Sequence, residues 1–292
     1  MKDKPSTTDC KGTQHPASHI ARICIESLYT ELVAYPKPGL VSLIDCGSHS
    51  DMTAQTLFRS IFALRRYFRD IAAAASRHIE FKALQKLGIL AESRMLRATA
   101  GINTHRGAIF NLGLLAAAAA YRSAGIAGDR GTLGDIVHAE WGPQIMLACG
   151  KENSHGSNAR KLYGAGGARC EAAQGFPHVF TVGLPSFLQT LHRTADVNRA
   201  AVQCFFNLMA VVEDTNLLHR GGPGGLDFAR TQAKAFLEKG GVLQTDWKTQ
   251  AIAIHDEFVV CNLSPGGSAD LLATTICAAG FDRLDGVRSC CR

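Results

Sequence analysis

Apolar side chains recur every three or four residues over long parts of the chain, and this period most constrains its fold. The clearest set, separated by arginines, is Leu57, Ile61, Leu64, Phe68 and Ile71. Such spacing gathers apolar side chains on one face of a helix, and it predicts a helix over residues 53–77. The same spacing predicts another over residues 196–213. No alternating apolar and polar run long enough for a sheet competes with these helices.

Residue composition also favours helices. The chain holds 41 alanines against 29 valines and isoleucines, and alanine loses no side-chain entropy in a helix whereas β-branched residues do. Further helices are expected at about 17–34, 80–99, 105–123, 132–149, 184–193, 226–239, 246–260 and 265–279. We therefore predict an all-α fold, a single globular multi-helix domain over residues 17–280, with flexible ends at residues 1–16 and 281–292.

Charge and cysteine usage exclude several classes of protein. The net charge of +6 suits small polyanionic substrates but is too small, without Lys/Arg runs, for a nucleic-acid-binding surface. The longest apolar runs, 112–120 and 202–212, are shorter than the roughly 20 residues needed to cross a bilayer, and no export signal is visible. The ten scattered cysteines favour free thiols. A cytoplasmic protein with no membrane partner is expected, and its oligomeric state is not indicated.

The first of four polar stretches near predicted helix ends is PKPGLV at 36–41, followed by GSHSDM at 47–52. Two prolines hold the backbone around Lys37 in a stiff turn, which suits contact with an anion. His49 and Asp51 follow in the second half of the stretch. The alternative is that Asp51 and Thr53 are simply helix caps.

The second stretch, GINTHRG at 101–107, precedes a helix made almost entirely of leucine and alanine. Unpaired backbone N–H groups at a helix start, with Arg106 beside them, favour a phosphate ligand. The alternative is that Asn103 or Thr104 caps the helix while His105 and Arg106 lie in solvent.

The third stretch runs over residues 213–225 as EDTNLLHRGGPGG. Glu213 and Asp214 are predicted to end an apolar helix, where the helix dipole disfavours acids, and a glycine loop with Arg220 at its start follows. Bound Mg²⁺ would explain the carboxylates. A frayed helix end with a solvated acid pair is the alternative.

The fourth stretch, LSPGGSADLL at 263–272, starts a helix with Ser264 as cap and proline in the first turn. Gly266 and Gly267 weaken that turn by roughly 1 kcal/mol each relative to alanine, which close approach of a ligand would justify. Asp270 is either a partner of the helix dipole or a metal-binding or basic carboxylate.

Known phosphate-binding signatures are absent from the sequence. Neither G-x-x-x-x-G-K-[ST] nor G-x-G-x-x-G occurs. His-Arg-Gly occurs twice, at 105–107 and 219–221, so two cationic triads could hold one extended polyanion. The glycine-rich segment 150–175 is either a loop over the site or a surface connection.

In order and spacing, the four stretches closely resemble the triphosphoribosyl-dephospho-CoA synthase family, over residues 22–280. The resemblance implies an all-α transferase that joins the triphosphoribosyl part of ATP to the ribose 2′-hydroxyl of 3′-dephospho-CoA and releases adenine. Its product would be the precursor of a prosthetic group for an acyl carrier protein. Of the two pathways that such enzymes serve, overall length and the lack of a fused second domain favour malonate decarboxylase over citrate lyase.

We assign roles on this basis as hypotheses. The triphosphate and pyrophosphate groups would be held by Lys37, Arg106, Arg220 and the amides of Gly221, Gly222, Gly266 and Gly267. Asp214 would bind Mg²⁺, with Asp51 or Asp270 as a further ligand, and the remaining carboxylate would accept the proton of the 2′-hydroxyl. His49, His105 and His219 are candidates to assist adenine. Further substrate contacts are expected from Asn103, Thr104, Thr215, Asn216, Ser264 and Ser268.

Two other functions fit part of the pattern. An all-α Mg²⁺-dependent ADP-ribosyl hydrolase would also cleave an anomeric bond, but it would transfer the sugar to water. A non-catalytic protein that delivers a CoA-type cofactor would explain the basic turns but not the clustered carboxylates. Release of adenine only in the presence of dephospho-CoA distinguishes the transferase from both.

Overall fold

A computed structural model describes residues 16–128, 130–148 and 167–289, with residues 283–289 described by their backbone only. These residues form helices and no β-strand, so the predicted all-α class is confirmed. The elements are α1 (Pro16–Val33), α2 (Ala54–Ala75), α3 (Phe81–Ala98), α4 (Arg106–Ser123), α5 (Leu133–Leu147), α7 (Gly167–Ala173), the π-helical turn η2 (Val179–Gly183), α8 (Leu184–Thr194), α9 (Val197–Val211), α10 (Thr215–Glu238), the 3₁₀ turn η3 (Gly241–Leu243), α11 (Trp247–Val260) and α12 (Gly266–Ser289).

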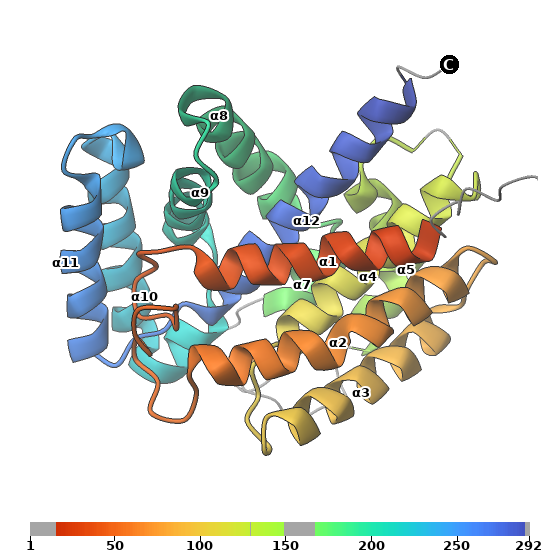
Figure 1. Cartoon of the computed structure of the whole chain (residues 1–292), viewed down its shortest axis with the longest axis horizontal. Coiled ribbons are helices and arrows are strands. Elements are labelled where there is room, and N and C mark those ends of the chain that lie inside the picture. The colour runs from red at the N-terminus through yellow and green to blue at the C-terminus, as the bar shows by residue number, and fades with distance from the viewer. Residues whose placement is uncertain (1–15, 129, 149–166, 290–292) are drawn as a thin grey trace, which may run out of the picture.

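Helix α4 lies at the centre of this arrangement. All of its residues from Asn111 to Tyr121 are buried, as expected for a helix that is apolar on every side. Helices α1, α2, α3, α5 and α12 pack against it. Figure 1 shows α2 and α3 side by side at the lower right, α10 and α11 together at the left, and α1 running across the middle.

The predicted helix over residues 53–77 corresponds to α2 and has the expected boundaries. Thr53 is its N-cap, and the Thr53 and Thr56 side chains bond to each other's backbone N–H in a capping box. Of the two caps that the sequence offered, Asp51 and Thr53, the helix therefore uses Thr53. The reciprocal bonds of the box satisfy backbone N–H groups that the start of a helix leaves unpaired.

The structure corrects the prediction for residues 213–225. Helix α9 ends at Val211, and Asp214 starts α10 as its N-cap instead of ending the preceding helix. The glycine-rich run that was expected to be a loop is helical, with a kink at Gly222, whose φ of 60° and ψ of −163° suit glycine. Pro223 follows this kink and starts the second half of the helix, where its missing N–H leaves no bond unmade.

Three further differences concern the second half of the chain. The sequence did not predict α7 or η2, and α12 continues to Ser289, beyond the expected end at 279. Of the glycine-rich segment 150–175, residues 150–166 lie outside the described part of the chain.

All cysteines in the described residues are free thiols, and the sulfurs of Cys24 and Cys277 are neighbours at 3.8 Å.

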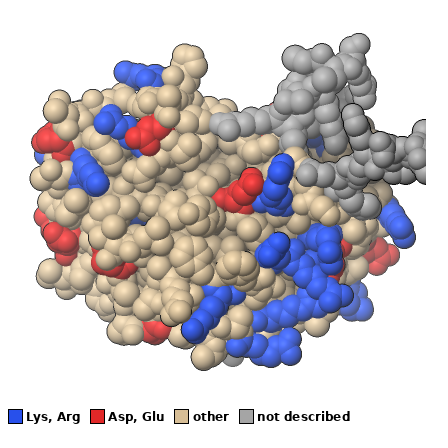
Figure 2. Space-filling model, viewed as in Figure 1, with Lys and Arg blue, Asp and Glu red and all other residues tan. Residues whose placement is uncertain are grey.

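Basic side chains gather on the surface of α2 and α3. Figure 2 shows them as a blue area at the lower right. The exposed basic residues of these two helices are Arg59, Arg65, Arg66, Arg69, Lys82, Lys86 and Arg97.

No helix in the described ranges is long and apolar enough to span a membrane.

The contact between α2 and α4 gives a test of the packing. A Cβ at Gly113 would overlap Tyr67 Oη, which is buried and donates a 3.0 Å bond to the Ile109 carbonyl. At Gly88 on α3, the nearest atom to a Cβ is Tyr67 Oη at 3.8 Å, an ordinary contact. We expect Gly113→Ala to lower the free energy of unfolding by about 1–3 kcal/mol and Gly88→Ala to raise it by up to about 1 kcal/mol. Urea unfolding measures both, and equal effects would contradict this packing.

Candidate active site

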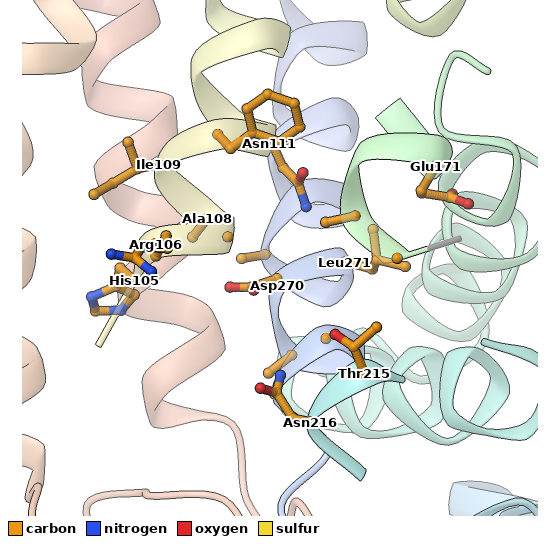
Figure 3. A pocket seen from close by; sticks show the side chains of 18 of the residues that line it. His105, Arg106, Ala108, Ile109, Asn111, Glu171, Thr215, Asn216, Asp270 and Leu271 are labelled. Carbon is orange, nitrogen blue, oxygen red and sulfur yellow. The ribbon is translucent and has the colours of Figure 1, made fainter. Parts of the chain in front are cut away.

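A cavity of about 920 Å³ lies where the four polar stretches meet. Each stretch contributes to its wall, together with residues of α1, α2, α3, α5 and α7. Figure 3 shows side chains from α4, α7, α10 and α12 around the same space. This volume is typical of a small-molecule site.

Asp270 on α12 faces the first turn of α4 (Figure 3) and accepts a hydrogen bond from the backbone N–H of Ala108. Gly107 permits this approach, because a Cβ there would overlap the Asp270 carboxyl. Burial raises the pKa of Asp270 well above its usual value, and the charges of Glu31 and Asp214 raise it further. The helix start that was expected to hold a phosphate therefore holds a carboxyl group of the protein itself.

His105, at the N-cap position of α4, is buried and lines the cavity. Its Nδ1 lies 2.6 Å from the hydroxyl of Ser60 on α2. Its Nε2 has no hydrogen-bond partner within the described part of the chain. Burial, followed by the charge of Lys37, lowers the pKa of His105 to about 4, so this ring is neutral at neutral pH.

Lys37 does not reach the cavity wall, contrary to its expected contact with phosphate. Its side chain is only 1% exposed. The ammonium group bonds to the backbone carbonyl and to the carboxylate of Glu31 on α1. Since a buried charge needs a partner, Lys37 compensates the charge of Glu31, which does line the cavity.

His49 and Arg220 join three segments at one edge of the cavity. His49 Nε2 lies 2.8 Å from Ser264 Oγ, and its Nδ1 lies 3.2 Å from the Arg220 guanidinium. Arg220 also donates to the carbonyls of Ser48 and Asn262, at 2.8 and 3.2 Å. Burial and the charge of Arg220 lower the pKa of His49. Arg220 thus connects two turns, while still lining the cavity.

Asp214 is the N-cap of α10 and is 1% exposed. One carboxylate oxygen accepts from the backbone N–H groups of Asn216 and Leu217, at 2.9 and 3.4 Å. The other accepts from the backbone N–H and the hydroxyl of Ser268, at 2.7 and 3.0 Å. Burial raises the pKa of Asp214 and these bonds oppose that rise. Because its acceptor positions are filled, Asp214 does not fit the role of a metal ligand.

The remaining predicted residues divide into two groups. Those that line the cavity are Asn103, Thr104, Arg106, Thr215, Asn216, Ser264, Gly266 and Gly267. Those that do not are Asp51, His219, Gly221, Gly222 and Ser268. Gly221 packs against Leu263, where a Cβ would come within 2.6 Å of the leucine side chain. Asp51 and His219 are exposed, and the Asp51 carboxylate lies 3.4 Å from His49 Nδ1.

Sequence reasoning missed a second polar wall of the cavity. Glu171 on α7 accepts from His178 at both its backbone N–H and its ring Nδ1, at 2.8 and 2.7 Å. The hydrogen bond to Glu171 raises the pKa of His178. Arg169 and Arg230 also line this wall. No motif marks these residues individually, although Arg169 and Glu171 fall within the glycine-rich segment 150–175.

Several buried polar atoms of the cavity wall have no partner in the described residues. They are the hydroxyl of Thr104, Nε2 of His105, both amide atoms of Asn111 and Nε of Arg230. Buried polar groups are normally paired, so their convergence on one cavity indicates a polar ligand. Within the described ranges, no group of three or more His, Cys, Asp or Glu side chains could hold a metal ion.

Comparisons with known proteins agree on one family. The model of the CitG family, described as ATP:dephospho-CoA triphosphoribosyl transferase, matches residues 17–289. A probable 2-(5″-triphosphoribosyl)-3′-dephosphocoenzyme-A synthase of Acinetobacter calcoaceticus is 38% identical over 90% of this chain and 91% of its own. The synthase of that name from Klebsiella pneumoniae is 38% identical over 91% of each chain. No solved structure matches.

The contacts of Asp214 lead to a prediction about stability. In Asp214→Asn, an amide NH₂ group replaces an oxygen that accepts from Ser268, so the backbone N–H of Ser268 loses its acceptor. We expect the free energy of unfolding to fall by about 1–3 kcal/mol, equally with and without Mg²⁺. The exposed change Asp227→Asn on α10 is the control and should stay within about 0.5 kcal/mol of the parent protein. Unchanged stability combined with a raised Mg²⁺ requirement would support a metal site instead.

Proposed function

Because the chain belongs to the ATP:dephospho-CoA triphosphoribosyl transferase family, we propose that it transfers the 5-triphosphoribosyl group of ATP to the ribose 2′-hydroxyl of 3′-dephospho-CoA, with release of adenine. The observation that carries this proposal is the cavity, where four arginines and several polar side chains without a partner in the described residues meet. Guanidinium groups bind phosphates through paired hydrogen bonds. Both substrates carry phosphates.

The reaction breaks the C1′–N9 bond of ATP and forms a bond between C1′ and the 2′-oxygen of dephospho-CoA. Adenine leaves with the electron pair of the broken bond and takes up a proton, while the 2′-hydroxyl loses one. Charge develops at C1′ in the transition state, as in other glycosyl transfers. The enzyme must therefore align the hydroxyl with C1′ and supply a group that accepts its proton.

Asp270 is our candidate for that proton acceptor. Its carboxyl lies in the cavity wall at the meeting point of α12 and α4, and the amide of Ala108 orients it. Burial raises its pKa, which brings its proton affinity closer to the operating pH and improves a general base. Of the histidines proposed to assist adenine, His49 and His105 line the cavity, whereas His219 does not.

Arginines on several sides of the cavity would hold the phosphate groups. Arg106 and Arg220 come from the predicted stretches, and Arg169 and Arg230 from the second wall. The exposed basic surface of α2 and α3 would attract the polyanionic substrates from solution. We propose that Mg²⁺ enters on the phosphate oxygens of ATP, because the described residues offer no group of three or more His, Cys, Asp or Glu side chains that could hold the ion by themselves.

The pathway is a further part of the proposal. The names of the relatives describe the reaction and do not distinguish malonate decarboxylase from citrate lyase. We propose malonate decarboxylase, on the sequence resemblance alone, and we propose that the product passes on toward an acyl carrier protein.

The proposed reaction is tested by incubating the purified protein with ATP, Mg²⁺ and 3′-dephospho-CoA. We expect adenine and a coenzyme product heavier by the triphosphoribosyl unit, in equal amounts, detected by chromatography and mass spectrometry. Omission of dephospho-CoA should abolish adenine release. Release of adenine without it would favour a hydrolase, and binding of both ligands without any turnover would favour a delivery protein.

The pKa of Asp270 leads to a pH prediction. Because Asp270 must be ionised to accept a proton, kcat/KM should rise with pH through a pKa above the ordinary 3.8 of an aspartate. Glu31→Gln removes a negative charge that opposes ionisation of Asp270. The acid limb of the kcat/KM profile, where activity rises with pH, should therefore move to lower pH by roughly 0.5–1 pH unit.

The control for that shift is Glu26→Gln, an exposed change on the same helix, which should leave the limb in place. Asp270→Asn should abolish turnover while both ligands still bind. An acid limb that stays in place or moves to higher pH in Glu31→Gln would exclude Asp270 as the group that titrates.

A further inference from the structure

The hydrogen bond between Ser60 and His105 joins α2 to the second polar stretch, at the N-cap of α4. Ser60 is fully buried and His105 is 4% exposed. The Ser60 hydroxyl lies 2.6 Å from His105 Nδ1, and it has no other partner in the part of the chain that the structure describes. The other ring nitrogen, Nε2, is buried without a partner there.

Hydrogen-bonding capacity decides which ring nitrogen carries the proton. A serine hydroxyl has one hydrogen to donate, and a neutral imidazole has one donor and one acceptor nitrogen. If Nδ1 carried the proton, it would donate to Ser60, and the hydroxyl hydrogen would be buried without an acceptor. If Nδ1 is the acceptor, the hydroxyl hydrogen is satisfied and the ring proton lies on Nε2. The first arrangement leaves the unpaired donor on Ser60, which is fully buried and does not line the cavity, whereas the second leaves it on Nε2 of His105, which lines the cavity and can donate to a ligand there. Buried donors are rarely left unpaired, so the second arrangement is favoured.

We propose that Ser60 is a positioning residue that holds His105 as the neutral tautomer with its proton on Nε2, and that this N–H donates to an oxygen or ring nitrogen of the bound adenine nucleotide. The ligand class rests on the proposed function. The tautomer and its dependence on Ser60 rest on the hydrogen bonds alone.

The surroundings of His105 suit a donor that keeps its proton. Burial and the charge of Lys37 lower its pKa to about 4, so the ring stays neutral while it donates. The Thr104 hydroxyl beside it also lacks a partner in the described residues, and Figure 3 places the Asp270 carboxyl opposite this start of α4. An acceptor bound here would satisfy donors that the protein leaves unpaired, next to the proposed proton acceptor.

The tautomer is tested directly by NMR. In protein labelled with ¹⁵N-histidine, two-bond ¹H–¹⁵N correlations distinguish the two neutral tautomers from the imidazolium, and His105→Gln identifies the His105 signals. At pH 7 we expect the Nε2–H form, and in Ser60→Ala we expect the Nδ1–H form to become populated. An imidazolium, an Nδ1–H form in the parent protein, or an unchanged tautomer in Ser60→Ala would overturn the proposal.

Binding and kinetics test the donor role. We expect Ser60→Ala to lower kcat/KM by about tenfold, the effect of one lost neutral hydrogen bond. The matched control is Ser27→Ala, which truncates another buried serine whose hydroxyl donates to the Ile23 carbonyl, and it should leave kcat/KM unchanged. His105→Phe should lose at least about tenfold, and His105→Gln, which keeps a donor near the Nε2 position, should lose less.

Calorimetric titration with ATP alone and with 3′-dephospho-CoA alone identifies the acceptor. The ligand whose affinity falls in His105→Phe, relative to His105→Gln, is the one that Nε2–H contacts. Equal affinities for both ligands and equal kcat/KM in the two variants would overturn the donor role. Should the parent protein release no adenine at all, the proposed function fails, while the NMR and binding results still decide the proposal for Ser60 and His105.

Discussion

The close approach of α12 to the first turn of α4 organises the site. A side chain at position 107 would prevent it, and with glycine there the Asp270 carboxyl meets the backbone N–H of Ala108. Asp214 then ties the start of α10 to the start of α12 through Ser268. Three helix starts consequently converge on one cavity, where the two carboxyl groups face their partial positive charge.

The fold was largely predictable because most helices have an apolar face. The stripe over residues 53–77 corresponds to α2 at Ala54–Ala75. The error over residues 213–225 arose because an acid between two helices can end one or start the next, and only the position of Val211 as the end of α9 decides between them. The helix through Gly221 and Gly225 depends on packing against Leu263, which lies too far away in the sequence to be foreseen.

Site residues were predictable from the sequence where a polar side chain lies next to a turn or a helix start. Asn103 and Asn216 line the cavity because they lie at helix starts, where polar groups and turns are expected. Lys37 could not be assigned from its own turn, because Glu31 on α1 decides where its charge is compensated. Glu171 lies in the glycine-rich segment 150–175, which marked a region but no single residue, and Arg230 carries no turn or glycine signal. Only the packing of α7 and α10 brings both to the cavity wall.

The central claim is that the reaction takes place where Asp270 faces the start of α4. A crystal structure of the protein with bound 3′-dephospho-CoA tests this most directly. The account predicts the ribose 2′-hydroxyl within about 2.6–3.2 Å of the Asp270 carboxyl. A ribose bound elsewhere, with Asp270 contacting no part of the ligand, would contradict it.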